Sequence, residues 1–386
     1  MTTIRSLTTR LQRVPLTRPW GEEVTSVGIV ATHVVRSDGA EGWGFAWTPQ
    51  IGASAVQALL ERDIAPASVG RSAVPGEAWQ DLWEHLHEAG GGGVTTIALA
   101  GLDLALWDAE ARSAGTTVSG LIGRRRERVR AYGSGVNLHY PLDELLAQVQ
   151  RWVDAGFDAV KIKVGRPDLA EDLERVAAVR EVLGPDRALM IDANQRWDLT
   201  AATTAIEALS RHDLTWVEEP LRADDLAGHT ELARRIDVPL AVGENLHTLH
   251  RVDDFLRAGA AQIVQPNIVR VGGITPFLRI AELAASHGAT LHPHLLPELS
   301  GQLALTLPDT GAELWVEDVE DAGFAALGAL VDSSPVRIAD GYLTENAHPG
   351  LGLRFAPLLG ADPSQPSEPF EPFEPFDPSQ PSAPTA

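Results

Sequence analysis

Three consecutive segments decide the fold: AVKIKVG (159–165), LAEDLERVAAVREVLG (169–184) and ALMIDAN (188–194). The two outer runs have the length and apolar character of buried strands, and the run between them has the spacing of an amphipathic helix. A strand, a crossover helix and a second strand form the unit of a parallel sheet. The chain therefore contains at least one such unit, and its fold depends on how often the unit recurs.

The same rhythm recurs from about residue 129 to the segment ELWVED (313–318). About eight short apolar runs alternate there with amphipathic stretches. Eight parallel strand–helix units close into a barrel, with active-site groups at the carboxyl ends of the strands. A doubly wound open sheet is the alternative, but no glycine-rich phosphate loop follows any of the strands. We therefore predict an α/β fold with a (β/α)8-type TIM barrel.

The segments on either side of the barrel have different patterns. In SVGIVATHVVRSDGAEGWGFAW (26–47) apolar and polar residues alternate, which indicates antiparallel strands joined by a Ser-Asp-Gly turn. Residues 51–122 are helical in pattern, and TTIALAGLDLALWDAEARSAG (95–115) is apolar enough for a core helix. The last residues, 358–386, are rich in Pro, Glu and Phe, which predicts a disordered acidic tail.

Composition narrows the class of protein. The chain has 386 residues, is 44% hydrophobic and carries a net charge of −22, which argues against nucleic acid or an anionic membrane as a partner. No apolar run is long enough for a transmembrane helix, and MTTIRSLTTRLQRVPL (1–16) is too polar for a signal peptide. The absence of cysteine excludes thiolate metal sites. We expect a cytoplasmic enzyme that binds a small molecule.

Polar side chains follow the apolar run of the second to the eighth barrel strand. They are Lys161, Lys163, Asp192, Asn194, Glu218, Glu219, Glu244, Asn267, His292, His294 and Glu317. In a barrel these residues converge on one mouth, where substrates bind.

Three of these carboxylates predict a metal site. Asp192, Glu218 and Glu244 lie at equivalent positions of three consecutive strands. Carboxylate oxygens without a nearby thiolate suit a hard divalent cation, and Mg²⁺ fits best. The alternative is that each carboxylate caps a helix or pairs with an arginine. We expect Glu219, next to Pro220, to point away from the site, because strand neighbours face opposite sides.

The two lysines then acquire a function. A metal ion and a second ammonium both disfavour protonation, so the pKa of Lys163 can fall far enough for this side chain to act as a general base. Lys161 can contact a substrate carboxylate. His294, on the opposite face of the mouth, offers a second acid or base. A protonated Glu317 could donate a hydrogen bond to an enediolate oxygen. This arrangement suits removal of a proton α to a carboxylate.

The motifs at the strand ends resemble those of the enolase superfamily, in particular its mandelate racemase-like branch, which includes many acid-sugar dehydratases. The resemblance extends to about residue 357 and is carried by KIK, DAN, EEP, GEN, QPNIVRVGGIT, HPH and WVED. It implies a modified (β/α)7β barrel over 128–329. It also implies an N-terminal α+β capping domain over 1–127, completed by about 330–357, and a homo-oligomer between dimer and octamer.

The resemblance also implies roles for individual residues. It implies that Asp192, Glu218 and Glu244 bind Mg²⁺. It also implies that Lys163 and His294 are the opposed acid/base pair. Lys161 is the implied electrostatic partner, Glu317 the oxyanion donor and Asn194 a substrate contact. Two capping-domain loops, around 14–26 and 45–54, would choose the substrate.

One residue departs from the pattern of that branch. The strand-six residue that orients the strand-seven histidine is usually Asp, and here it is Asn267. An amide oxygen can still accept the imidazole N–H but brings no charge, so we expect His294 to be a weaker base. The absence of a lysine at this position argues against muconate lactonising and dipeptide epimerase activity.

We therefore predict Mg²⁺-dependent dehydration of an aldonate or aldarate through an enediolate, giving a 2-keto-3-deoxy acid. A racemase or epimerase of a 2-hydroxy carboxylate is the first alternative, and a catalytically impaired metal-dependent binding protein is the second. Three further residues are candidate substrate contacts. Trp20 and Trp47 are expected in loops that close over the mouth. His292 could share the inward face of His294, but its position is more typical of a structural histidine.

Overall fold

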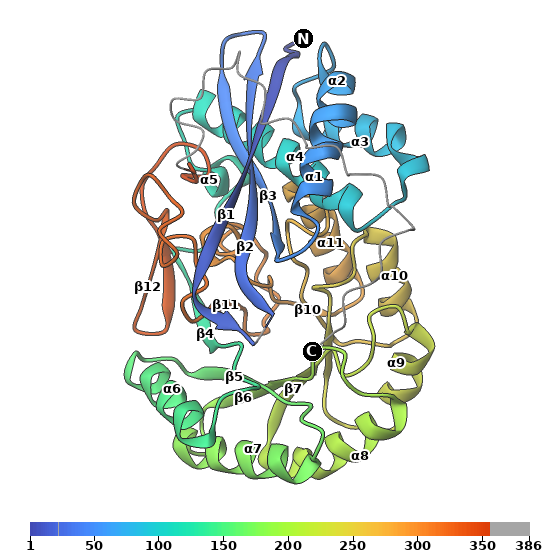
Figure 1. The fold of residues 1–386 in the computed structure, drawn as a ribbon, viewed down its shortest axis with the longest axis vertical. Coiled ribbons are helices and arrows are strands. Elements are labelled where there is room, and N and C mark those ends of the chain that lie inside the picture. The colour runs from blue at the N-terminus through green and yellow to red at the C-terminus, as the bar shows by residue number, and fades with distance from the viewer. Residues whose placement is uncertain (22, 356–386) are drawn as a thin grey trace, which may run out of the picture.

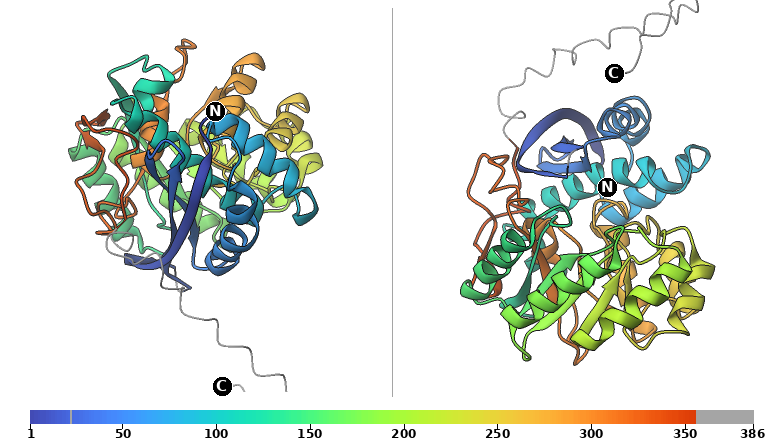
Figure 2. Two further views of the ribbon diagram at one scale, coloured as in Figure 1. Left: turned by 90° about the horizontal axis from the view of Figure 1, so that it is seen from above. Right: turned by 60° about the horizontal axis from the view of Figure 1, so that its bottom comes forward.

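A computed structural model describes residues 1–21 and 23–355, and its elements fall into two parts (Figure 1). Residues before about 123 form the capping domain, and the following residues form a barrel closed by outer helices (Figure 2). The predicted tail, residues 358–386, lies outside the described residues. Within the described part of the chain, no helix has both the length and the apolar character needed to cross a membrane.

The capping domain begins with an antiparallel sheet in the order β1 (Ile4–Trp20), β2 (Val24–Arg36) and β3 (Glu41–Pro49). The turn between β2 and β3 contains Ser37, Asp38 and Gly39, as the sequence predicts. Gly39 has φ +87°, which an L side chain rarely adopts.

Helices cover one side of this sheet. They are α1 (Ala53–Leu59), the π-helical η1 (Leu60–Ile64), α2 (Ala65–Ser68), α3 (Pro75–His85), the 3-10 turn η2 (His87–Ala89), α4 (Val94–Ser113) and α5 (Val118–Ile122). Helix α4 is buried around most of its circumference, so the prediction of a core helix is confirmed. Strand β3 lies so close to α4 that a Cβ at Gly42 or Gly44 would meet the backbone of the helix.

Residues 128–319, all of them described, form a barrel of eight parallel strands with seven helices between them. The strands are β4 (Arg128–Ser134), β5 (Ala159–Lys163), β6 (Ala188–Asp192), β7 (Leu214–Glu218), β8 (Leu240–Val242), β9 (Ile263–Val264), β10 (Thr290–Leu291) and β11 (Trp315–Val319). The helices are α6 (Leu142–Asp154), α7 (Leu169–Leu183), α8 (Leu199–Leu209), α9 (Leu226–Ala233), α10 (Leu249–Arg257), α11 (Ile274–Ser286) and α12 (Pro297–Ala304); the short η3 (Ser210–His212) follows α8. The predicted (β/α)7β barrel is confirmed.

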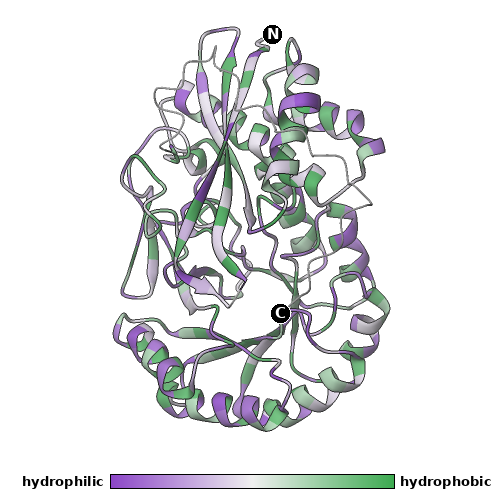
Figure 3. Ribbon diagram, in the orientation of Figure 1, coloured by the Kyte–Doolittle hydropathy of each residue, from purple (hydrophilic) through white to green (hydrophobic). Residues whose placement is uncertain are grey.

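The outer helices are amphipathic, as a strand–helix barrel requires. Figure 3 shows hydrophilic and hydrophobic residues alternating along α6 and α7. In α6 the buried residues are Leu145, Gln148, Val149 and Trp152. Their spacing of three and four residues places them on one side of the helix, where they pack against the strands.

A side chain contributes to closing the barrel between β10 and β11. Strand β11 pairs in parallel with β4, and β10 pairs with β9. His292, just after β10, accepts a hydrogen bond through Nδ1 from the backbone N–H of Trp315, at 3.1 Å. Its ring stacks on those of Trp216 and Trp315, with centroids 5.0 and 5.4 Å away. His292 therefore joins two strands at the closure.

The last described segment contacts both parts of the molecule. The hairpin of β12 (Val336–Ala339) and β13 (Tyr342–Glu345) extends the barrel sheet, because β13 pairs antiparallel with β4. Residues beyond it reach the capping domain, where the N–H of Leu351 donates to Asp108 of α4 and the ring of Phe355 packs edge-on against Phe45 of β3. The described part of the predicted segment, residues 330–355, thus extends the barrel sheet as well as packing on the capping domain.

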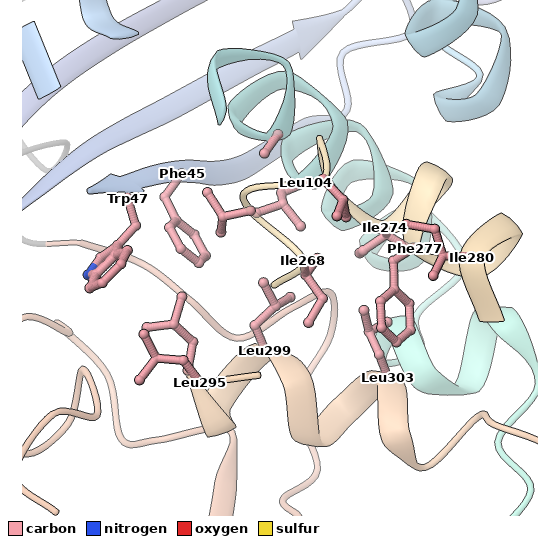
Figure 4. Close-up of a cluster of buried hydrophobic side chains, with 14 of the residues drawn as sticks. Phe45, Trp47, Leu104, Ile268, Ile274, Phe277, Ile280, Leu295, Leu299 and Leu303 are labelled. Atoms are coloured by element: carbon pink, nitrogen blue, oxygen red, sulfur yellow. The ribbon is translucent and has the colours of Figure 1, made fainter. Parts of the chain in front are cut away.

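One hydrophobic core joins the two parts (Figure 4). Phe45 and Trp47 of β3 meet Ile268, Leu295 and Leu299 from the barrel's later loops and α12. All five side chains are buried. The capping domain is therefore packed on the carboxyl ends of barrel strands.

Replacing Gly44 by Ala is expected to destabilise the protein by about 2 kcal/mol or more, because the added methyl would overlap the backbone of α4. Gly76→Ala is the matched control: it lies in α3, has an ordinary φ and has no atom within 4 Å of the new Cβ. It should be neutral or stabilising by up to about 1 kcal/mol. Urea unfolding midpoints test both, and equal effects would contradict the close packing of β3 on α4.

Candidate active site at the barrel mouth

Strand register brings together the first groups of the site. Lys163 at the end of β5 is the register partner of Asp192 on β6, which is in turn the partner of Glu218 on β7. Because parallel strands carry aligned residues to the same face, these three side chains share one layer of the barrel mouth. Lys161 lies one layer deeper and its side chain is fully buried, whereas that of Lys163 is 12% exposed.

Glu244 reaches the same layer by a different path. Strand β8 ends at Val242, and the register partner of Glu218 there is Ala241. Glu244 lies three residues beyond that partner, after Gly243 with φ +147°, where a Cβ would collide with the backbone of Gln265. The prediction of equivalent positions therefore holds for Asp192 and Glu218 but is wrong for Glu244, which depends on a glycine bend.

The lysines are paired with carboxylates. Lys161 Nζ lies 2.7 Å from Glu218 Oε2 and 2.8 Å from Glu317 Oε1, and Lys163 Nζ contacts Asp192 Oδ2. Burial lowers the pKa of Lys163, but the facing Asp192 more than offsets this, so the pKa is raised. This differs from the lowered pKa that the sequence predicts, because the carboxylate of Asp192 faces the Lys163 ammonium directly.

Lys161 is held in the same way. Burial lowers the pKa of Lys161, but Glu218 and Glu317 raise it well above its usual range. Lys161 is therefore an ammonium fixed between two strands of the barrel.

Glu317 is an acceptor in this structure. Its carboxylate receives Ser134 Oγ at 2.8 Å, Lys161 Nζ at 2.8 Å and the N–H of Leu295 at 3.0 Å. Burial raises the pKa of Glu317, but Lys161 and His294 lower it, to about 2. In this arrangement Glu317 accepts hydrogen bonds and orients Lys161, and its role as a protonated donor to an enediolate oxygen stays a prediction.

His294 lies opposite Lys163 across the carboxylates. It follows β10 and is anchored by its backbone N–H to Pro266 O at 3.2 Å, and the next residues, Leu295 and Leu296, have φ of +57° and +51°. Its Nε2 lies 2.6 Å from Glu244 Oε2 and 3.5 Å from Glu317 Oε2. Burial lowers the pKa of His294, but the two carboxylates more than offset this and raise it.

Asn267 contacts the other nitrogen of this imidazole. Its Nδ2 lies 3.1 Å from His294 Nδ1, and its Oδ1 accepts the backbone N–H of Arg270 at 3.1 Å. The expectation that the amide oxygen accepts from the imidazole is therefore wrong, because that oxygen is already used by the turn that Asn267 begins.

Glu219 is a residue whose placement the sequence predicts wrongly. It has φ +38°, an unusual conformation that turns its side chain toward Asn245 instead of away from the site. Both carboxylate oxygens of Glu219 accept from Asn245 Nδ2, at 3.0 and 2.8 Å. Burial, Glu244 and Asp192 raise the pKa of Glu219 well above its usual range. These surroundings favour the neutral form of the Glu219 carboxyl group over the charged form.

Asn245 and Arg270 complete this side of the site, and sequence analysis missed both. Asn245 Nδ2 also lies 2.9 Å from Glu244 Oε1, and Arg270 Nη1 donates to Asn245 Oδ1 at 2.7 Å. Asn245 lies in the GEN motif beside Glu244, and Arg270 lies in the QPNIVR motif three residues after Asn267. Their positions within these motifs could have identified both residues from the sequence.

The carboxyl groups fit a divalent cation. Asp192, Glu218, Glu219, Glu244 and Glu317 are all buried together. Glu218 Oε1 is buried and has no hydrogen-bond partner, and burial together with neighbouring carboxylates raises the pKa of Glu218 to about 7 despite Lys161. Oxygen donors from Glu218 and Glu244 and a nitrogen of His294 lie within 4.8 Å of one another, while Asp192 is turned to Lys163. A cation would provide a partner for Glu218 Oε1, whereas Oε2 already faces Lys161.

The other residues predicted to contact the substrate lie in different surroundings. Asn194 is exposed, with φ +43°. Trp20 and Trp47 lie at strand ends, not in loops, with ring centroids 6.2 Å apart, and Trp47 is buried against the core of Figure 4. His292 is buried at the barrel closure, and burial lowers its pKa to about 4, which favours the structural alternative.

Comparison with known proteins agrees with this architecture. Residues 4–123 match the model of the mandelate racemase / muconate lactonizing enzyme N-terminal domain, and residues 144–358 match the enolase C-terminal domain-like model. Among curated relatives, a 3,6-anhydro-alpha-L-galactonate cycloisomerase from Streptomyces coelicolor is 34% identical over 91% of this chain and 96% of its own length. An L-talarate/galactarate dehydratase from Salmonella typhimurium is 37% identical over 77% of this chain and 74% of its own.

Solved structures are similar over the same extent. A racemase from Streptomyces coelicolor with bound magnesium superposes with a TM-score of 0.85 at 33% identity, covering 91% of this chain and 97% of its own. An L-talarate dehydratase from Polaromonas sp. with Mg and L-glucarate gives 0.82 at 36% identity, covering 92% and 96%. The chain belongs to the mandelate racemase / muconate lactonizing enzyme family, in which this capping domain accompanies an enolase-like barrel.

Proposed function

We propose that this protein catalyses the Mg²⁺-dependent dehydration of a sugar acid, an aldonate or aldarate, to a 2-keto-3-deoxy acid. The observation that carries the proposal is the mostly buried Lys163 beside a cluster of buried carboxylates with an unpaired oxygen on Glu218. Relatives named as L-talarate/galactarate, arabinonate and D-galactonate dehydratases support the same reaction class.

Asp192, Glu218 and Glu244 are the residues that would hold Mg²⁺. Their oxygen chemistry suits this ion, and two solved relatives contain it. When bound, the cation supplies positive charge that stabilises an enediolate. Glu219 lies beside these ligands but is engaged with Asn245.

The protein's own residues then supply binding and proton transfer. The Lys161 ammonium, fixed by Glu218 and Glu317, attracts the substrate carboxylate. Lys163 is the more exposed lysine and is positioned to remove the α-proton once Asp192 no longer holds it as an ammonium. When the β C–O bond breaks, its electron pair leaves with the oxygen, which takes a proton from His294 on the other face of the mouth and departs as water.

Two other reactions share the first step. Racemisation or epimerisation of a 2-hydroxy carboxylate needs a capable base on each face, and the amide of Asn267 gives His294 no negative partner at Nδ1. Ring opening by the same elimination is suggested by relatives named as cycloisomerases. A catalytically impaired binding protein would bind Mg²⁺ and an acid without exchange of the α-proton. Cytoplasmic location and a homo-oligomer stay predictions.

Incubating the protein with Mg²⁺ and pools of sugar acids in D₂O should consume one acid and yield a deuterated 2-keto-3-deoxy product, followed by proton NMR. Lys163→Ala should lower the rate by about a thousandfold or more, because it removes the base. Lys163→Arg, which keeps the charge beside Asp192 but not the basicity, is the matched control and should be equally inactive. Exchange without elimination would favour an epimerase instead.

Mg²⁺ should raise the thermal unfolding midpoint of the metal-free protein, because it binds the folded state alone. Asp192→Asn, Glu218→Gln and Glu244→Gln should each abolish most of this shift. Glu219→Gln should retain it, since both oxygens of Glu219 are engaged with Asn245 and this residue is not among the proposed ligands. Loss of the shift in Glu219→Gln alone would contradict the assigned ligands.

A further inference from the structure

A side chain of the capping domain caps a helix of the barrel. Helix α11 begins after Gly273, which has no side chain that could accept the unpaired N–H groups of the first helical turn. Asp103 of α4 supplies this acceptor. Its Oδ2 accepts the backbone N–H of Thr275 at 3.0 Å, and its Oδ1 accepts the Thr275 hydroxyl at 2.5 Å. The carboxyl group of Asp103 therefore takes the place of an N-cap side chain, from another domain.

The close approach of the two segments depends on Gly273. Its φ is +111°, and a Cβ at this position would overlap the carboxyl group of Asp103. Asp103 and Thr275 are both buried. The neighbouring Leu104 and Ile274 belong to one hydrophobic cluster, which joins the two domains (Figure 4). The cap is therefore part of the packed domain interface.

Two tryptophans of the capping domain hold the same segment. Trp107, one helical turn after Asp103 on α4, donates through Nε1 to Thr275 Oγ1 at 3.0 Å. Trp79 of α3 donates through Nε1 to the carbonyl of Gly272 at 2.9 Å. The Thr275 hydroxyl thus donates to Asp103 and accepts from Trp107, as a hydroxyl can. The beginning of α11 is therefore fixed to two helices of the capping domain.

The turn that leads into α11 is closed by its own backbone. The N–H of Val271 bonds to the carbonyl of Asn267 at 3.0 Å, and the N–H of Gly273 bonds to that of Ile268 at 2.8 Å. These bonds connect the last residue before the helix to the beginning of the turn. A displacement of the helix end is therefore transmitted to Asn267.

This turn carries two residues of the active site. Asn267 Nδ2 lies 3.1 Å from His294 Nδ1. Arg270 Nη1 donates to Asn245 Oδ1 at 2.7 Å and to the backbone carbonyl of Glu244 at 3.2 Å. The turn therefore contacts both the imidazole on one face of the mouth and the segment that carries a carboxylate.

We infer that Asp103 is a positioning residue of the active site, which acts across the domain interface by holding the turn that carries Asn267 and Arg270. The inference about position follows from geometry alone, and its consequence for the reaction rests on the proposed function. A displacement of about 1 Å far from the reacting atoms can lower a rate by about a hundredfold. The capping domain would thus contribute to proton transfer at His294 without contacting this residue through Asp103.

Asp108 provides a matched comparison on the same helix. It is also a buried carboxyl group of α4, and it accepts the backbone N–H groups of Trp43 at 2.9 Å and of Leu351 at 2.7 Å. These partners lie in β3 and in the last described segment, away from the turn before α11. Loss of Asp108 should therefore weaken the attachment of α4, as loss of Asp103 does, without moving that turn.

The position of the turn can be measured in the full chain without a substrate. Hydrogen–deuterium exchange, followed by mass spectrometry, should be faster by about tenfold in peptides over residues 267–277 of Asp103→Ala, because the cap is lost. Asp108→Ala should leave these peptides unchanged. The His294 ring signal in ¹H–¹³C NMR, identified by its loss in His294→Gln, should move in Asp103→Ala only. Asp103→Asn, which keeps an oxygen for the Thr275 N–H, should resemble wild type in both measurements.

Two results would overturn the inference. One is unchanged exchange over residues 267–277 in Asp103→Ala. The other is faster exchange with an unmoved His294 signal, which would show that Asp103 is structural alone. Thr275→Val decides the question if Asp103→Ala does not fold, because it removes the hydroxyl contacts but keeps the N–H that is capped. It should cause smaller changes of the same kind, and no change in either measurement would contradict the inference.

Steady-state kinetics test the consequence for the reaction. With Mg²⁺ and the sugar acid identified in D₂O, Asp103→Ala should lower kcat by about tenfold or more and change KM little. Asp108→Ala and Asp103→Asn should keep kcat within about twofold of wild type. An equal loss of kcat in Asp103→Ala and Asp108→Ala would overturn the positioning role. Turnover of no acid by wild type would count against the proposed function, while exchange and NMR would still decide the position of the turn.

Discussion

The burial of five carboxyl groups beside two lysines at the barrel mouth is the constraint on which the rest of this structure depends. Charges out of water are costly unless they are paired, and here Lys161 is paired with Glu218 and Glu317, and Lys163 with Asp192. Glu218 nevertheless keeps a buried oxygen without a partner. The site is thus arranged for an additional cation, and the surrounding barrel holds these charged groups close together.

The protein holds them together through interactions that lie outside the site. His292 joins β10 to β11 beneath the mouth, Gly243 bends the chain so that Glu244 reaches the carboxylates, and the turn begun by Asn267 orients His294. From the other side, Phe45 and Trp47 of the capping domain pack on Leu295, next to His294 (Figure 4). Capping domain and barrel are therefore one packed unit around the site, and either part alone would leave apolar surface exposed.

Much of this was predictable because the signals are local. Strand periodicity and helix spacing predicted the barrel, the capping strands and the Ser-Asp-Gly turn, and polar residues after apolar runs predicted Lys161, Lys163, Asp192, Glu218 and His294 at one mouth. What could not be predicted depends on single backbone angles and on partners distant in sequence. Glu219 turns into the site because its φ is +38°, and Glu317 is ionised because Ser134, Lys161 and Leu295 all donate to it.

Asn267 separates the two kinds of knowledge most clearly. The sequence by itself determined that an amide replaces a carboxylate at this position, and therefore that His294 has no negative partner at Nδ1. Only the tertiary structure decided which end of the amide faces the ring, because the backbone N–H of Arg270, in the turn that Asn267 begins, takes the oxygen. An amide has a donor end and an acceptor end of nearly the same shape, so its direction depends on a neighbour that can do only one of the two.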